Sequence, residues 1–266
     1  MSIFIHEQNI KTKVKNSKGQ KKVLFQNFYG QTYLDLHRHL MRIKFDKTES
    51  FKVLAKAANA YLREIDTFCD SNDISSQSKF RSSFLEELSE YMFKDLPAIK
   101  RKELGFFNKG IFAGMKIGTN MSPAVITKDV DFCIGKKVPI SIGNDSFEII
   151  MPIIAVEVKT YLDATMFGEV QHSSGLLKNA IPNVKTYVLM EYNRVANEKI
   201  IAARHENNVD EMFALRLKKE SEKYKISAKV LQNYYDEVVG ALKSIRSKRH
   251  NKVNEFGKLL DRERYI

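Results

Sequence analysis

The sequence contains little of what marks secreted, fibrous or disordered proteins. Only two cysteines occur in 266 residues, Cys69 and Cys133, and no second pair is present that could complete a zinc site. We therefore expect a reduced, intracellular setting rather than a disulfide framework. Glycine and proline are also few, at 12 and 5 residues, which argues against a fibrous or low-complexity chain.

Long apolar runs are absent as well. Residues 1–15 lack the apolar core and cleavage site of a secretory signal, and no segment approaches the roughly 18 consecutive apolar residues of a membrane span. We expect a cytoplasmic protein without a membrane segment. The remaining composition, 43% apolar and 29% charged, is typical of a helix-rich globular protein with a substantial core.

Acidic residues are fewer than basic ones, 32 against 44, which gives a formal net charge of +12. This excess favours a DNA or RNA partner without choosing between them, although many basic proteins only carry solvated lysines. Residues 11–22 hold six lysines and no acid. We expect residues 1–30 to form a basic arm, which either follows a phosphate backbone or is a loose terminus. Near the other end, a predicted helix carries basic residues that either contact DNA phosphates or form a solvated face: Lys243, Arg246, Lys248, Arg249 and Lys252.

The rest of the chain, residues 31–266, is expected to form one domain in three parts. Helical spacing of apolar residues predicts helices at residues 33–44, 48–69 and 79–96, within a helical layer at 31–118. The central part, 119–200, contains predicted strands at 124–138, 147–161 and 186–191 and a helix at 163–179. The C-terminal part, 201–266, is predicted to be helical at 210–224 and 228–260. This order predicts an α/β fold, a central mixed sheet flanked by helices with helical N- and C-terminal extensions.

Three charged residues lie on the two central strands. Asp131 follows Val130 in the segment VDFCI, and Glu157 and Lys159 lie in VEVK at the end of a nearly continuous apolar run. Side chains alternate along a strand, so Glu157 and Lys159 share a face and Val158 points away. If the strands are neighbours, the charges meet at one sheet end. There the two carboxylates and the Val158 carbonyl could hold Mg²⁺, and the ammonium could approach a phosphate.

Other interpretations of these residues remain open. An isolated Glu-x-Lys is more often a simple ion pair, by about ten to one. The longer pattern here is more restrictive, because it joins DxDFxI, a turn, an apolar run and EVKTY. Asp129 is an alternative to Asp131, since it lies two residues away on the same face. Asp131 is preferred because the apolar strand continues directly from it.

This pattern resembles the PD-(D/E)XK nuclease superfamily. The block VEVKTYLDATM, residues 156–166, is similar to one in the BbvCI and DdeI group of type II restriction endonucleases, which cut CCTNAGC- or CTNAG-type sites. The resemblance covers roughly the central third of the chain. The proline of the motif name is missing, because Val130 stands before Asp131, but that proline is not required chemically.

The resemblance implies a restriction-endonuclease-like core in which Asp131, Glu157 and Lys159 are catalytic and Mg²⁺ is held by the two carboxylates. In that superfamily an acid from the preceding helix often borders the metal. Glu87, at the edge of an apolar stripe, is the candidate here, and a solvent-facing Glu87 is the alternative. The resemblance also implies a site-specific deoxyribonuclease acting on double-stranded DNA. Double-strand cleavage needs two active sites, so a homodimer or a heterodimer with a related subunit is expected.

Two other functions compete with this one. The first is a repair or junction-resolving nuclease on the same core, which specific cleavage of a short duplex sequence would distinguish. The second is a non-catalytic DNA-binding subunit of a heteromeric nuclease, which would bind DNA without metal-dependent cutting.

Overall fold

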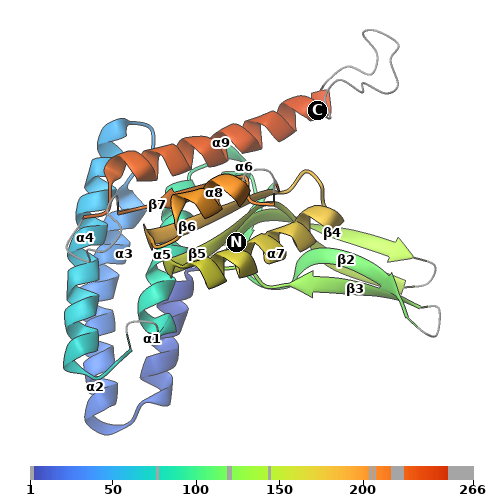
Figure 1. Ribbon diagram of the computed structural model, residues 1–266. Coiled ribbons are helices and arrows are strands. Elements are labelled where there is room, and N and C mark those ends of the chain that lie inside the picture. The colour runs from blue at the N-terminus through green and yellow to red at the C-terminus, as the bar shows by residue number, and fades with distance from the viewer. Residues whose placement is uncertain are drawn as a thin grey trace.

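A computed structural model describes residues 3–75, 78–118, 122–142, 145–203, 206, 208–216 and 225–250. Within these ranges the chain forms a mixed sheet flanked by helices, with helices at both ends (Figure 1). The helices are α1 (Ile5–Asn16), α2 (Gly19–Asn27), the π-helix η1 (Phe28–Tyr33), α3 (Leu34–Arg42), α4 (Thr48–Ser71), α5 (Lys79–Phe93), α6 (Pro97–Lys100), α7 (Ala164–Ala180), α8 (Asn197–Ala203) and α9 (Ala228–His250). The strands are β1 (Gly105–Phe107), β2 (Ile111–Ile117), β3 (Pro123–Lys128), β4 (Phe132–Ile142), β5 (Asp145–Leu162), β6 (Lys185–Asn193) and β7 (Glu211–Ala214). No helix in the described ranges is long and apolar enough to cross a membrane.

Strand β5 is the centre of the sheet. It pairs antiparallel with β4 along most of its length, parallel with β2 at Ile111 and Ile150, and parallel with β6 in its second half. The predicted apolar run lies in this second half. Ile154 and Val156 pack into the core shared with the helical layer, and Ala155 packs on the opposite face in a cluster that includes Leu177 of α7. Because both faces are covered, the run has no polar alternation until the strand approaches its end.

Several predicted strand boundaries are wrong. The single strand expected at residues 124–138 is two strands: β3 pairs with β2, β4 pairs with β5, and residues 129–131 connect them. Strands β1 and β2 lie within residues expected to belong to the helical layer. Residues 211–214, expected to be helical, form β7 against β6. In each case a short segment is held by its ladder to a neighbouring strand, which local helical spacing does not reveal.

The N-terminal residues expected to form a basic arm are helical. Helices α1 and α2 bury His6, Ile10 and Phe25, and the six lysines of residues 11–22 are exposed. The predicted helix at the other end begins as expected at Ala228, and Leu231, Tyr234 and Val238 are buried along it. The structure describes α9 as far as His250, so the rest of the predicted helix, with Lys252, lies outside the described residues.

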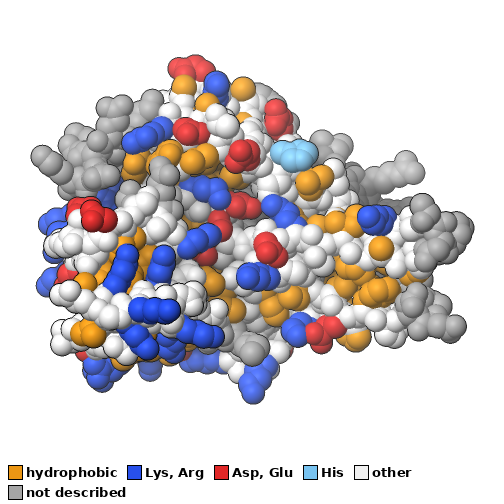
Figure 2. All heavy atoms as spheres, turned by 90° about the horizontal axis from the view of Figure 1, so that it is seen from below, with side chains coloured by type: hydrophobic (Ala, Val, Ile, Leu, Met, Phe, Trp, Pro, Cys, Tyr) orange, Lys and Arg blue, Asp and Glu red, His pale blue; other side chains and the backbone are white. Residues whose placement is uncertain are grey.

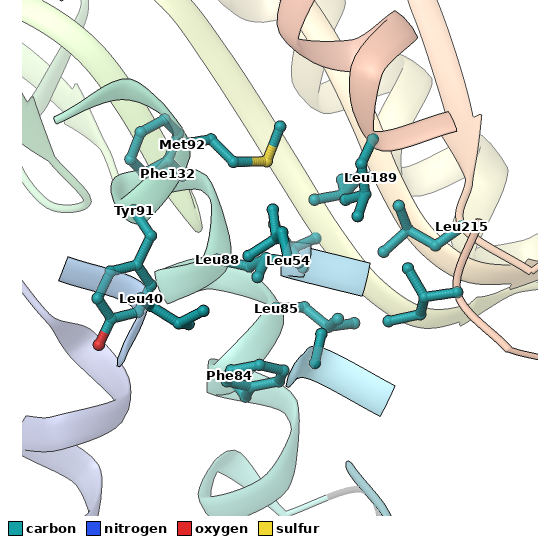
Figure 3. Close-up of a cluster of buried hydrophobic side chains, with 14 of the residues drawn as sticks. Leu40, Leu54, Phe84, Leu85, Leu88, Tyr91, Met92, Phe132, Leu189 and Leu215 are labelled. Carbon is teal, nitrogen blue, oxygen red and sulfur yellow. The ribbon is translucent and has the colours of Figure 1, made fainter. Parts of the chain in front are cut away.

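Helix α5 joins the helical layer to the sheet. Almost all of its residues are buried, and Leu85, Leu88 and Met92 lie among side chains from both layers (Figure 3). On the helical side these are Leu40 and Leu54, and on the sheet side Phe132 and Leu189. A helix buried on all sides leaves no solvent for its polar side chains, so each needs a protein partner.

Gly135 sits where the β4–β5 register shifts. A Cβ at this position would lie 2.6 Å from the carbonyl oxygen of Met151, which is backbone and cannot turn aside. We expect Gly135→Ala to lower the free energy of unfolding by about 1–3 kcal/mol, measured by urea denaturation. Gly240→Ala is the matched control, because a Cβ on exposed Gly240 of α9 meets nothing within 4 Å and alanine favours helix. Equal stability of Gly135→Ala and the wild type would contradict the expected clash.

Candidate active site

Three charged side chains lie together beside the paired ends of β4 and β5. Asp131 immediately precedes β4, whose first residue, Phe132, pairs with Val156 of β5. The Lys159 ammonium lies 3.4 Å from Asp131 Oδ2 and 3.2 Å from Glu157 Oε2. The structure thus brings together the three residues that the sequence pattern singles out.

The main chain of β5 orients Asp131. The Val158 N–H donates a 2.8 Å hydrogen bond to Asp131 Oδ2, and the Val158 side chain is buried in the core cluster that contains Ile154 and Val156. Packing of these three side chains sets the rotation of the strand, and therefore sets the face on which Glu157 and Lys159 stand. A register slip of one residue would exchange the two faces and separate the charges.

The three side chains are partly shielded from water. Asp131 and Glu157 are each 17% exposed and Lys159 is 29% exposed. Burial by itself would lower the pKa of Lys159, but the nearby charges of Asp131 and Glu157 more than offset it and raise the pKa. The site is therefore a coupled group of charges that is still open to small ions and water.

Two further lysines contact the same carboxylates, and sequence reasoning missed both. Lys128, the last residue of β3, lies 3.5 Å from Glu157 Oε1, and its ammonium also donates to Ser173 of α7. Lys79, the first residue of α5, lies 3.5 Å from Asp131 Oδ1. In the sequence these are two of many lysines, and only the fold places them beside the carboxylates.

The acid of α5 nearest to this cluster is Glu86. Its Oε1 lies 3.2 Å from the Lys79 ammonium, so Lys79 connects Glu86 to Asp131. Burial raises the pKa of Glu86, and the negative charge of Asp131 adds to this effect.

The prediction for Glu87 requires correction, because the structure does not bring it to the three charged residues. Glu87 is 1% exposed, which also excludes the solvent-facing alternative. It accepts hydrogen bonds from the N–H groups of His6 and Glu7 and from the hydroxyls of Tyr33 and Tyr91, at 2.8–3.0 Å. The carboxylate therefore caps the first turn of α1, whose amides have no partner within the helix.

The buried position of Glu87 predicts a pH-dependent stability. Burial raises its pKa to about 7, so the folded protein holds a proton that the unfolded chain releases near pH 4.5. The stability that the raised pKa contributes is fully present below about pH 4.5 and is lost as the pH rises through about 7. The wild type should lose unfolding free energy between pH 5 and pH 8, whereas Glu87→Gln has no such titrating group. The difference between the two proteins should therefore shift by roughly 2–3 kcal/mol in favour of Glu87→Gln over this range. Urea denaturation of both proteins across this range gives the difference, and parallel curves would contradict the prediction.

Other residues weighed from the sequence lie elsewhere or have other partners. Asp129 accepts a 3.0 Å hydrogen bond from the Gly110 N–H and so caps the β1–β2 connection. Lys243 is exposed on α9, whereas for Arg246, Lys248 and Arg249 the structure describes the helix backbone and not the side chains. Their contact with DNA stays a prediction.

The donor atoms of the site suit a hard divalent cation. Among the residues that the structure describes, no group of three or more His, Cys, Asp and Glu side chains is arranged to hold a metal. Mg²⁺ does not require one, because it keeps several waters and is commonly bound through one or two carboxylates together with substrate phosphate. Asp131 and Glu157, joined through Lys159, match that limited donor set.

Comparisons with known proteins find a matching family model and a similar solved structure. The model of the family described as Bpu10I restriction endonuclease matches residues 77–244. Comparison with curated proteins finds no match. Among solved structures, the chain is similar to one described as the native BbvCI A2B2 tetramer at low resolution, with a TM-score of 0.68 and 15% identity. The similarity covers 91% of this chain and 95% of the other, and at this identity it shows the shared fold.

Proposed function

The chain belongs to the Bpu10I restriction endonuclease family, and from this premise we propose that it cuts DNA at a short specific duplex sequence in a Mg²⁺-dependent reaction. The main support for the proposal is the position of the Lys159 ammonium, which lies within 3.4 Å of both Asp131 and Glu157. Two carboxylates and an ammonium at adjacent strand ends are the groups that phosphodiester hydrolysis needs.

Asp131 and Glu157 would hold the Mg²⁺, with the Val158 carbonyl as a further ligand. When bound, the cation would polarise the scissile phosphate and lower the pKa of a bound water. The Val158 N–H donates to Asp131 Oδ2, which keeps this carboxylate fixed beside β5. Ser173 donates to Glu157 Oε1 at 3.2 Å and limits the rotation of the second carboxylate.

Lys159 would act on the phosphate and on the attacking water. Its ammonium lies between the two carboxylates, so a phosphate oriented by these groups would come within its reach. There it would orient the water and stabilise the negative charge that develops on the phosphate oxygens. Because its side chain is partly buried on β5, fewer water molecules compete with the phosphate for the ammonium group.

The charge distribution supports a DNA-binding face. Figure 2 shows one face on which acidic and basic side chains alternate across the middle and basic side chains gather at the left, over the helical layer. The exposed lysines of residues 11–22 lie along α1, α2 and the turn between them, and α1 packs on α5 of this layer. Phosphate contacts of this kind position a duplex without reading its sequence.

Assembly with a second active site completes the proposal. One chain carries one set of these three residues, whereas cutting both strands needs two. A homodimer would suit a palindromic site, and a heterodimer with a related subunit would suit an asymmetric one of CCTNAGC type. The similar solved structure is described as an A2B2 tetramer, which favours the heteromeric arrangement.

The first test is incubation of the protein with a mixed-sequence plasmid in Mg²⁺ or in EDTA, followed by sequencing of the product ends. Discrete fragments with a common end sequence, formed only with Mg²⁺ and absent with Asp131→Asn, would support the proposal. Site-specific nicks in one strand would support the heteromeric form of it. DNA binding without cutting in any divalent cation would overturn the catalytic proposal for this chain alone.

A further inference from the structure

Each carboxylate of the candidate active site is held between two lysines. Asp131 Oδ2 and Glu157 Oε2 face Lys159, at 3.4 and 3.2 Å. The remaining oxygens face other lysines: Asp131 Oδ1 lies 3.5 Å from Lys79, and Glu157 Oε1 lies 3.5 Å from Lys128. All four oxygens that could bind a cation therefore already have an ammonium group nearby.

Lys128 is part of a small network of side-chain contacts. Its ammonium reaches Glu157 and Ser173, and Ser173 donates to the same Glu157 oxygen at 3.2 Å. The Lys128 side chain is 24% exposed, so it lies against the site and does not extend into solvent. The strand end and helix α7 thus hold a positive charge against the outer side of Glu157.

Lys79 has a different setting. It begins α5, its side chain is 70% exposed, and its ammonium lies between Asp131 Oδ1 and the buried Glu86. A long, mostly exposed side chain exchanges partners at little cost. Its ammonium can leave Asp131 when a stronger ligand for that oxygen, or a better anion for the lysine, arrives.

Resting on the proposed function, we propose that Lys79 and Lys128 are counterions which compete with the divalent cation, and that Lys79 moves to DNA phosphate when the duplex binds. In the DNA-free protein they lower the affinity of the carboxylates for the cation. The duplex supplies phosphates that draw the exposed Lys79 ammonium away and leave Asp131 Oδ1 free for the cation. Cation binding and DNA binding then strengthen each other by the same factor, because such coupling is reciprocal.

The test measures binding and not cleavage. Isothermal titration of Mg²⁺ into DNA-free protein compares wild type with Lys79→Met and Lys128→Met, which keep an unbranched side chain, one atom shorter, and remove the charge. We expect each variant to bind Mg²⁺ about threefold to fivefold more tightly, the upper part of the range that partly exposed charge pairs contribute. Lys128→Arg keeps the charge and should remain near wild type.

A matched control separates the contact from the general loss of a positive charge. Lys109 is exposed in the β1–β2 connection, two residues before β2, and pairs with no acid among the described residues. Lys109→Met should leave Mg²⁺ affinity within twofold of wild type. Urea midpoints for every variant show whether the fold is intact.

The coupling is measured in a second arm with Ca²⁺ and a duplex that carries the sequence cut in the plasmid experiment. The ratio of Ca²⁺ affinities with and without the duplex should be severalfold smaller in the Lys79→Met, Lys128→Met double variant than in wild type. Unchanged Mg²⁺ affinity in both single variants would overturn the inference. A wild-type protein that binds Mg²⁺ and cuts no DNA would instead overturn the proposed function, so the two failures are distinguishable.

Discussion

Lys159→Met is expected to lower the rate of DNA cleavage by about 10³-fold while the protein still folds and binds DNA. Methionine fills the same space along β5 but cannot donate hydrogen bonds or stabilise charge. Asp131 and Glu157 keep Lys79 and Lys128 as neighbours, so removal of Lys159 does not leave them without a positive charge. The loss should therefore be confined to the chemical step.

Single-turnover cleavage of plasmid DNA, with protein in excess, measures that step directly. DNA affinity, from fluorescence anisotropy with a labelled duplex, should stay within about threefold of wild type, since one phosphate contact at most is lost. Lys137→Met is the matched control. Lys137 also projects from the sheet, on β4, but among the described residues its only ion pair is with exposed Glu148, so its removal should not change the rate measurably. Retention of more than a tenth of the wild-type rate in Lys159→Met would remove Lys159 from the chemical step.

The predictable part of the site is the part that depends on strand alternation. Glu157 and Lys159 share a face because they are two residues apart on a strand, and the apolar run before them identifies that strand as central. Asp131 joins them because β4 and β5 are a sequence-local hairpin with antiparallel register. Strand alternation, together with the assumption that two consecutive strands pair, was enough to place these three side chains together.

The residues that surround the site could not be found in this way. Lys79 lies 52 residues before Asp131 and Lys128 lies 29 residues before Glu157, and their contacts with these carboxylates arise only after folding. The choice of Glu87 over Glu86 failed for a related reason. The apolar stripe of a helix distinguishes a buried face from an exposed one. Because nearly all residues of α5 are buried, the stripe does not show whether Glu86 or Glu87 faces the site.

An ion cluster connects α5 to the sheet, with two arginines and Glu191 buried and Asp66 at its partly exposed edge, and none of it was visible in the sequence pattern. Arg81 donates through Nε to Asp66 at 2.6 Å, and its Nη groups donate to Glu191 of β6. Glu191 also lies 3.0 Å from Arg216 Nη2, just beyond β7. Burial would lower the pKa of Arg81, but the charges of Glu191 and Asp66 more than offset it and raise the pKa above its ordinary value.

Loss of the Glu191 charge is expected to have the largest effect on stability of any single change considered. Glu191→Gln keeps the shape of the side chain but leaves two arginines, each about 6% exposed, without their shared carboxylate. Breaking a buried pair in this way typically costs about 3–5 kcal/mol, which is a large fraction of the stability of an ordinary domain. Urea denaturation at pH 7 measures the loss.

Glu148→Gln provides the comparison, because it removes a carboxylate that is 61% exposed and paired with Lys137 on the same sheet. Its effect should stay within about 0.5 kcal/mol. If Glu191→Gln is as mild as Glu148→Gln, the buried cluster does not hold α5 to the sheet. If it is severe, Arg81→Met combined with Glu191→Leu should recover part of the loss, because apolar groups replace one of the two buried arginines that share Glu191 together with that carboxylate, while Arg216 remains. Helix α5 begins at Lys79, two residues before Arg81, so the same cluster would then fix the helix end that reaches Asp131.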